Sequence, residues 1–253
     1  LLGNPNAGKS SLFNQLTGLR QKVGNFPGVT VERKSGFIKS ENKEIEIIDL
    51  PGTYSLYPTS LDERIAVNAL IDAANKDYPD AIVYILDVTN LERHLLLLTQ
   101  IADVGFPVLV ALNMNDIAAQ QNIQCDEKKL SAALGIDVIK INGRTGEGVD
   151  TVKSKLNGLL GEHKNELSAS AFYELTDEEK SIASKVSQLL RVKNEYHALL
   201  FAHHSKKNNF LKEDKKKQLQ EIVLRNNFNP LNNQLDEIMH RYNKFTPIVN
   251  SVL

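Results

Sequence analysis

Gly3-Asn-Pro-Asn-Ala-Gly-Lys-Ser10 is the stretch of this 253-residue chain that decides its fold. It fits the pattern of a phosphate-binding loop, in which glycine, four residues and Gly-Lys-Ser connect a buried strand to a helix. Glycines allow backbone N–H groups to turn inward around a phosphate. We expect Lys9 to reach β- and γ-phosphate oxygens and the Ser10 hydroxyl to bind Mg²⁺, at the positive end of the following helix. The loop therefore predicts a strand–loop–helix unit that holds a nucleotide.

The composition is that of an ordinary globular protein, with 42% hydrophobic and 24% charged residues. A net charge of −1 argues against a broad nucleic-acid-binding face, and the single Cys125 excludes an internal disulfide. No apolar run approaches the roughly 18 residues that span a bilayer. Only Leu1 and Leu2 precede the loop, whereas a buried strand has about five residues. We therefore expect the chain to begin inside a strand, as a fragment or with its first residues missing.

Short apolar runs alternate with helical patterns up to about residue 160, which is typical of a mostly parallel sheet covered on both faces. Several of these runs are β-branched and uninterrupted, as in strands that are buried on both sides. They predict an α/β domain over residues 1–160. We expect strands over 36–39, 45–49, 81–87, 108–112 and 137–141. We expect helices over 9–16, 60–74, 91–103, 126–134 and 148–159.

The pattern changes beyond residue 160. Residues 161–168 are polar and are typical of a linker. Thr176-Asp-Glu-Glu179 is a capping box that begins a helix with apolar residues on one face. Residues 165–253 are therefore predicted to form a small all-helical domain. Its further helices are expected over 211–225 and 232–242.

Two segments after other predicted strands distinguish a nucleotide site from a chance glycine-rich turn. In Asp49-Leu-Pro-Gly52 the carboxylate suits a Mg²⁺-bound water and the Gly52 N–H suits a γ-phosphate. Asn113-Met-Asn-Asp116 lies where GTPases carry Asn-Lys-x-Asp. The Asp116 carboxylate can accept from both N1–H and the exocyclic amine of guanine, which adenine does not offer. We expect guanine selectivity, and weaker nucleotide retention because Met114 replaces the lysine.

Two more segments complete the expected site. Gln21-Lys-Val-Gly-Asn-Phe-Pro-Gly-Val-Thr30, called switch I below, places two glycines and a proline around one threonine. This composition favours a mobile segment that closes on a γ-phosphate, with Thr30 giving Mg²⁺ its second hydroxyl. Asn142-Gly-Arg144 follows the last predicted strand, where GTPases carry a Ser-Ala that backs the base. Here Arg144 is expected to cover part of the base instead.

Together these segments resemble the G domain of the FeoB family, bacterial ferrous-iron transporters with a cytosolic GTPase ahead of a membrane domain. The resemblance rests on Val23-Gly-Asn-Phe-Pro-Gly-Val-Thr-Val-Glu32, on Asp49-Leu-Pro-Gly-Thr-Tyr-Ser-Leu56 and on Met114. It covers residues 1–160, and over 165–253 it holds by position and class. It implies a Ras-like P-loop GTPase domain with a mostly parallel six-stranded sheet. It also implies a helical module that the family associates with restraint of GDP release.

The resemblance assigns the site residues as follows. Lys9, Thr30 and Asn6 are the expected catalytic residues. Mg²⁺ is expected on Ser10, on Thr30 and, through water, on Asp49. The expected GTP-binding residues are Gly3, Asn4, Pro5, Asn6, Ala7, Gly8, Lys9, Ser10, Ser11, Gly28, Val29, Thr30, Val31, Glu32, Asp49, Leu50, Pro51, Gly52, Asn113, Met114, Asn115, Asp116, Asn142, Gly143 and Arg144.

Thr53 occupies the position where Ras-type GTPases place the glutamine that orients the attacking water. Its side chain is too short for that task, so we expect slow intrinsic hydrolysis. In potassium-activated GTPases, a class to which the resemblance points, an asparagine at the position of Asn6 ligates K⁺ together with switch I carbonyls. Gly24 and Phe26 match those carbonyls by position, which makes K⁺ a second candidate cofactor. Alternatively, Asn6 only accommodates the turn of the loop.

Two features stay outside the predicted site. His203 and His204 are neighbours on a predicted helix, where side chains point about 100° apart and rarely share a metal. A helix-end or surface position is expected for both. Glu63 lies in the expected switch II region, but an acidic residue equally suits the first turn of a helix.

The sequence thus predicts a slow GTPase switch domain at the cytoplasmic face of a bacterial inner membrane. Its expected partners are GTP and GDP and the membrane transport domain of the same polypeptide. A second copy of the chain and small accessory transport proteins are further candidates, and no nucleic acid is expected. Two alternatives stay open: a soluble potassium-dependent GTPase of ribosome assembly or tRNA modification, and a nucleotide-gated interaction module without useful turnover.

Overall fold

The structure is a computed structural model that describes residues 1–19, 21–40, 43–160, 171–207 and 211–253. The predicted linker over 161–168 lies outside these residues. The strands are β1 (Leu2–Gly3), β2 (Gln21–Asn25), β3 (Glu32–Ser40), β4 (Lys43–Asp49), β5 (Ile82–Asp87), β6 (Val108–Asn113) and β7 (Val138–Lys140). The α-helices are α1 (Lys9–Thr17), α2 (Leu61–Ile71), α3 (Leu91–Val104), α4 (Asn115–Gln120), α5 (Glu127–Leu134), α6 (Val149–Leu159), α7 (Asp177–Leu190), α8 (Glu195–His203), α9 (Glu213–Arg225) and α10 (Pro230–Val252).

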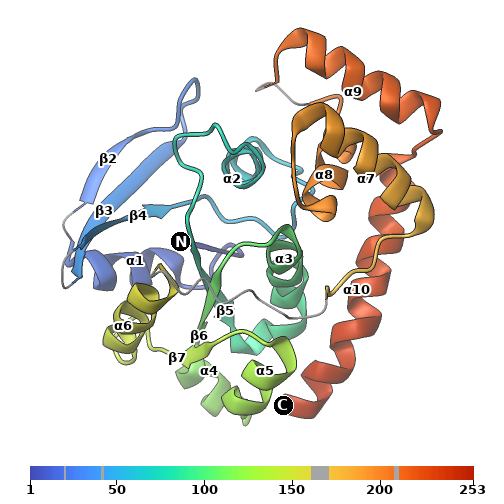
Figure 1. Cartoon of the computed structure of the whole chain (residues 1–253). Coiled ribbons are helices and arrows are strands. Elements are labelled where there is room, and N and C mark those ends of the chain that lie inside the picture. Colours follow the sequence, from blue (N-terminus) through green and yellow to red (C-terminus); the bar gives the residue numbers. More distant parts are fainter. Residues whose placement is uncertain (20, 41–42, 161–170, 208–210) are drawn as a thin grey trace.

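A parallel sheet in the order β1-β5-β6-β7 lies at the centre, next to an antiparallel ribbon in the order β2-β3-β4 (Figure 1). The two join at Leu1, whose N–H donates to the Ile48 carbonyl at 2.8 Å and whose carbonyl accepts from the Leu50 N–H at 3.2 Å. This alternation of bonds is that of a parallel pair. The mostly parallel α/β fold predicted from the sequence is therefore confirmed, with β2 as an additional strand at the edge.

The buried strands use both of their faces because helices cover the sheet on both sides. Along β5, Val83 and Ile85 point into one apolar cluster with residues of α1 and α6. Ile82, Tyr84 and Leu86 point into a second cluster with residues of α2, α3 and the C-terminal helices. Alternate residues of a strand face opposite sides, so each of these side chains is buried. Each buried aliphatic side chain stabilises the fold by about 1.5–3 kcal/mol relative to exposure.

The C-terminal helices pack beside the sheet. In Figure 1, α7, α8 and α9 lie at one end, and α10 runs past α3 toward α5. The carbonyl of Val252, at the end of α10, accepts from the Asp126 N–H at 2.9 Å, which ties α10 to the start of α5. Among the described helices, none has both the length and the apolar character needed to cross a bilayer.

Four elements differ from the sequence-based expectation. The short helix α4 was not expected, because residues 113–116 were interpreted only as a base-binding segment. Helix α8 was missed because it is buried on nearly all sides and so lacks an amphipathic pattern; its signal was Asn194, whose side chain caps it. Helix α10 continues past the expected end at residue 242 and through Pro247, since Phe245, Val249 and Val252 are buried. Strand β2 was not expected: the first half of switch I, which was predicted as a mobile segment, pairs with β3.

Buried histidines make the stability depend on pH. Burial lowers the pKa of His94, His203 and His204 to about 4, and it lowers the pKa of His197 as well. The ordinary value is 6.5, so the unfolded chain binds more protons than the folded chain between pH 6.5 and about 4. We expect the free energy of unfolding to be fully retained above pH 6.5 and to fall as the pH decreases through this window. Urea denaturation at about pH 7.5 and about pH 5 measures it, and equal values would contradict the prediction.

Candidate nucleotide-binding site

The loop between β1 and α1 has the backbone that the motif predicts. Gly8 adopts a left-handed conformation with φ of 93°, and a Cβ built there would lie 2.2 Å from the Asn113 Nδ2. Only glycine therefore fits this position without displacing a neighbour. Asn6 is also left-handed, with φ of 65°, and its side chain is exposed. Asparagine tolerates this conformation better than most residues.

An ion pair joins the loop to the end of β4. The Lys9 Nζ lies 2.9 Å from the Asp49 Oδ1, and the side chains are only 14% and 7% exposed. The Ser10 hydroxyl donates to the Asp49 Oδ2 at 3.5 Å. The structure thus brings the predicted phosphate-binding lysine and two predicted magnesium-binding oxygens to one point. Hydroxyl and carboxylate oxygens are the donors that Mg²⁺ prefers, so this donor set fits that ion.

The segment after Asp49 packs directly against the loop. A Cβ built on Gly52 would lie 2.9 Å from the Pro5 backbone nitrogen, so the backbones are in contact. The Thr53 N–H donates to the Gly3 carbonyl at 3.3 Å. The Thr53 side chain is fully buried, and its hydroxyl donates to the Ser55 carbonyl at 2.8 Å. In this arrangement the hydroxyl of Thr53 has a structural partner.

Asn113 links the phosphate loop to the segment that follows β7. Its Nδ2 donates to the Ala7 carbonyl at 2.9 Å, and its Oδ1 accepts from the Gly143 N–H at 3.1 Å. Asn115 makes a second link, with its Nδ2 donating to the carbonyls of Leu112 at 2.8 Å and of Ile141 at 3.2 Å. The two asparagines therefore fix the spacing between the loop and the predicted base-binding segments.

The predicted base-binding residues lie together at the rim. Asp116 and Arg144 form an ion pair at 3.5 Å, with 40% and 83% of their side chains exposed. The Asn142 side chain organises this turn by accepting from the Arg144 and Thr145 N–H groups at 3.0 and 3.1 Å. The Met114 Cε lies 3.5 Å from a Cβ built on Gly8, so this side chain reaches over the phosphate loop.

Switch I forms the hairpin of β2 and β3, to one side of α1 in Figure 1. The Phe26 N–H donates to the Val31 carbonyl at 2.9 Å, and the Phe26 carbonyl accepts from the Val29 N–H at 3.3 Å, which closes the turn between β2 and β3. Thr30 is exposed in this turn, and Gly24 lies in β2 opposite Arg33. The hairpin therefore carries the Thr30 hydroxyl that was predicted to bind Mg²⁺. It also carries the Gly24 and Phe26 carbonyls that were predicted to bind K⁺.

Two other residues, Glu63 and Tyr84, take roles that were not assigned from the sequence. Glu63 is part of the capping box of α2, and its carboxylate also accepts from the N–H groups of Tyr54 and Thr59. Tyr84 was missed; its hydroxyl donates to the His94 carbonyl at 2.7 Å and lies 3.1 Å from the Asn4 Oδ1, so β5 contacts the loop here. A tyrosine within the otherwise aliphatic run of β5 was the available signal.

The histidine pair lies at the end of α8, which agrees with the helix-end alternative, and both residues are only partly exposed. The His204 Nε2 lies 2.9 Å from the Leu56 carbonyl, and the His203 ring packs edge-on against Tyr57 with centroids 4.9 Å apart. Both histidines thus contact the segment that follows Gly52. This packing could not be predicted from local sequence, because the contacting residues are nearly 150 positions apart.

Comparisons with known proteins agree with this geometry. Residues 1–156 match the family model described as ferrous iron transport protein B. The Fe(2+) transporter FeoB of Leptospira biflexa is 42% identical over 192 residues, which are 76% of this chain and 27% of that protein. FeoB of Escherichia coli strain K12 is 47% identical over 157 residues, or 60% of this chain and 20% of that protein. The chain thus spans about a fifth to a quarter of the curated relatives it matches.

Solved structures give the same result over nearly the whole chain. The cytosolic domain of L. pneumophila FeoB superposes with a TM-score of 0.78 at 34% identity, and the match covers 99% of this chain and 97% of that chain. A GDP-bound mutant of S. thermophilus NFeoB gives a TM-score of 0.72 at 33% identity, with 98% and 97% covered. Since the family model matches well over half of the residues, the chain belongs to the ferrous iron transport protein B (FeoB) family and contains its N-terminal G domain.

Proposed function

We propose that this chain binds GTP and GDP with Mg²⁺ and hydrolyses GTP slowly, as the nucleotide switch of a ferrous-iron transporter. The observation that carries the proposal is the partly buried Lys9–Asp49 ion pair beside the Ser10 hydroxyl. A lysine and a carboxylate there suit a polyphosphate and its metal ion, respectively. The GDP-bound state of the S. thermophilus relative supports a guanine nucleotide.

Each group of the site has a distinct proposed task. Lys9 contacts the β- and γ-phosphates, and Ser10 and Thr30 provide hydroxyls for Mg²⁺, with Asp49 bound through water. When bound, Mg²⁺ neutralises negative charge on the phosphates. Asp116 accepts from guanine once Arg144 turns away from it. The Thr53 hydroxyl donates to the Ser55 carbonyl and orients no water, so GTP hydrolysis is slow.

The proposed role in iron transport rests on membership of the FeoB family. Residues 1–160 form the GTP-binding unit, and residues 165–253 form a helical unit that senses its nucleotide state. A membrane transport domain of the same polypeptide receives the signal at the cytoplasmic face of the bacterial inner membrane. A second copy and small accessory transport proteins are proposed as further partners. Membership of the FeoB family favours this role over a soluble GTPase of ribosome assembly or tRNA modification.

Guanine selectivity is tested by titration calorimetry of the purified chain with Mg²⁺ and GTP, ATP or xanthosine triphosphate. We expect heat from GTP, with ATP at least about a hundredfold weaker, because adenine offers no matching pair of donors to Asp116. Asp116→Asn should move the preference toward xanthosine triphosphate, whereas Asp150→Asn at an exposed position should not. Strong ATP binding with no heat from GTP would refute the proposed function.

Gly8 provides a second test of the same pocket. Gly8→Ala should abolish GTP binding, because the new methyl group meets Asn113 and the backbone is left-handed. Gly158→Ala is the matched control, since a Cβ there meets nothing within 4 Å in the described structure. The control should keep its affinity and gain a few tenths of a kcal/mol or more in stability. Undiminished GTP binding by Gly8→Ala would place the nucleotide elsewhere.

The proposed potassium site rests on Asn6, with the carbonyls of Gly24 and Phe26. We expect GTP hydrolysis to be severalfold faster in K⁺ than in matched Na⁺ buffer, and Asn6→Ala to remove the difference. Asn122→Ala is the control because Asn122 is likewise exposed and left-handed, with φ of 57°. It should leave the ratio of the two rates unchanged. Equal rates in K⁺ and Na⁺ with the unmodified chain would eliminate K⁺ as a cofactor.

A further inference from the structure

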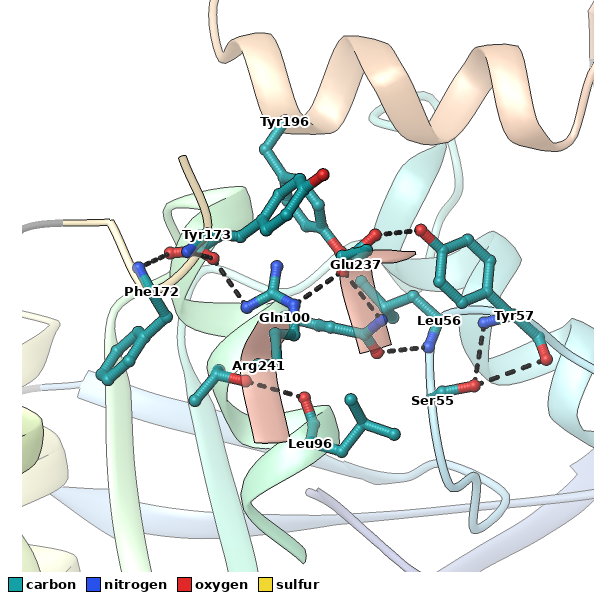
Figure 2. A network of polar contacts seen from close by, with 12 residues as sticks. Ser55, Leu56, Tyr57, Leu96, Gln100, Phe172, Tyr173, Tyr196, Glu237 and Arg241 are labelled. Carbon is teal, nitrogen blue, oxygen red and sulfur yellow. Dashed lines mark hydrogen bonds and ion pairs between the residues drawn. The ribbon is translucent and has the colours of Figure 1, made fainter. Parts of the chain in front are cut away.

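A buried polar network lies between the G domain and α10, far from the phosphate loop in sequence. Its centre is Glu237, which is fully buried (Figure 2). The carboxylate accepts from the Arg241 Nε at 2.6 Å, the Tyr196 hydroxyl at 2.6 Å and the Gln100 Nε2 at 3.2 Å. The Tyr57 hydroxyl donates to its other oxygen. Four donors from four different segments therefore converge on one carboxylate.

This network holds residues 53–57, the segment that directly follows Gly52. The Leu56 N–H donates to the Gln100 Oε1 at 2.8 Å, and the Leu56 carbonyl contacts the His204 Nε2 at 2.9 Å. The Leu56 side chain is fully buried. Gln100 thus joins the Leu56 backbone to Glu237 through its two amide atoms, as Figure 2 shows. Both backbone groups of Leu56 are engaged, one by α3 and one by the end of α8.

The buried charges of this network oppose any other position of residues 53–57. Burial raises the pKa of Glu237, but the Arg241 guanidinium and the hydrogen bonds outweigh burial, and the pKa is lowered. Arg241 is itself fully buried, pairs with Asp103 at 2.7 Å and lies over the Tyr196 ring at 4.9 Å. A buried charge that loses one partner is strongly destabilised, because water does not replace the lost contact. Residues 53–57 can therefore leave this position only if the network is broken.

We propose that Glu237 is a positioning residue that selects GTP over GDP by holding residues 53–57, and with them Gly52, against the phosphate loop. The proposal rests on the proposed function and adds the regulation of its site by α10. The Gly52 backbone already contacts Pro5 of the phosphate loop. Under the proposed function its N–H binds the γ-phosphate from this position. A segment that is held in advance loses less conformational freedom when GTP binds. GDP has no γ-phosphate and gains little from Gly52, so the network acts on GTP alone.

The test compares the affinities of two nucleotides for the 253-residue chain in which Glu237→Gln removes the charge and keeps the shape. We expect the dissociation constant for the non-hydrolysable β,γ-imido analogue of GTP to rise at least about fivefold, a typical size for coupling between sites. The dissociation constant for GDP should stay within about twofold. A variant that only destabilises the fold would not change the ratio of the two affinities.

Glu179→Gln is the matched control. Glu179 is also a buried carboxylate of the C-terminal helices and also binds a tyrosine hydroxyl, that of Tyr173 at 2.9 Å. It caps α7, a task that glutamine performs as well, so the ratio of the affinities should stay unchanged. The proposal is overturned if Glu237→Gln leaves the affinity for the GTP analogue unchanged relative to that for GDP. It is also overturned if Glu179→Gln lowers this relative affinity by the same factor.

A second variant keeps the test decisive if Glu237→Gln does not fold. Tyr57→Phe removes one hydroxyl from the network and no charge, and it should weaken binding of the GTP analogue about twofold or more without weakening GDP. An unchanged ratio in Tyr57→Phe would then overturn the proposal. The unmodified chain separates this outcome from failure of the proposed function, since only the latter predicts no guanine-nucleotide binding by any version of the chain.

Discussion

The partly buried ion pair between Lys9 and Asp49 is the contact on which the rest of the site depends. It joins the first residue of α1 to the last residue of β4 and so fixes the loop against the neighbouring strand. Both side chains are mostly withdrawn from water, and either charge alone would be costly there. Each compensates the other in this structure. A nucleotide with its metal ion would offer each of them a new partner of the right charge, which is why we propose the pair as the centre of the nucleotide site.

The fold provides this contact through its topology. Parallel strands end at one edge of the sheet, so the loops after β1, β4, β6 and β7 meet there although they are distant in sequence. Asn113 then connects two of them through its amide, to Ala7 and Gly143. The same sheet supports α3, whose Gln100 and Asp103 reach the C-terminal helices. One layer of strands therefore links the phosphate loop to the buried charges around Glu237.

The parts that sequence reasoning predicted are those set by local chemistry. The loop, the ends of β4 and β6 and the capping box of α7 depend on residues close in sequence, and glycine, serine or threonine at those positions has a direct physical reason. The parts that it missed depend on distant partners. Helix α8 has no amphipathic pattern because it is buried nearly all round. Nothing near Glu237 in sequence indicates that Tyr57 and Gln100 surround it.

Switch I also combines a feature that was predicted from local sequence with one that was not. Its glycines and proline were apparent in the sequence, but the pairing of β2 with β3 is carried by the backbone and left no apolar alternation to recognise, since all of β2 is exposed. The exposed Thr30 lies on that hairpin. The account of the site therefore requires the hairpin to approach the phosphate loop when nucleotide binds, and it requires Lys9 and Asp49 to exchange partners.

A crystal structure of this chain with Mg²⁺ and a non-hydrolysable GTP analogue tests that exchange most directly. The account predicts that the Lys9 Nζ leaves its position 2.9 Å from the Asp49 Oδ1 and contacts phosphate oxygens, while Asp49 turns to water on the metal ion. Nucleotide bound at another surface, with the Lys9–Asp49 pair still intact, would contradict it.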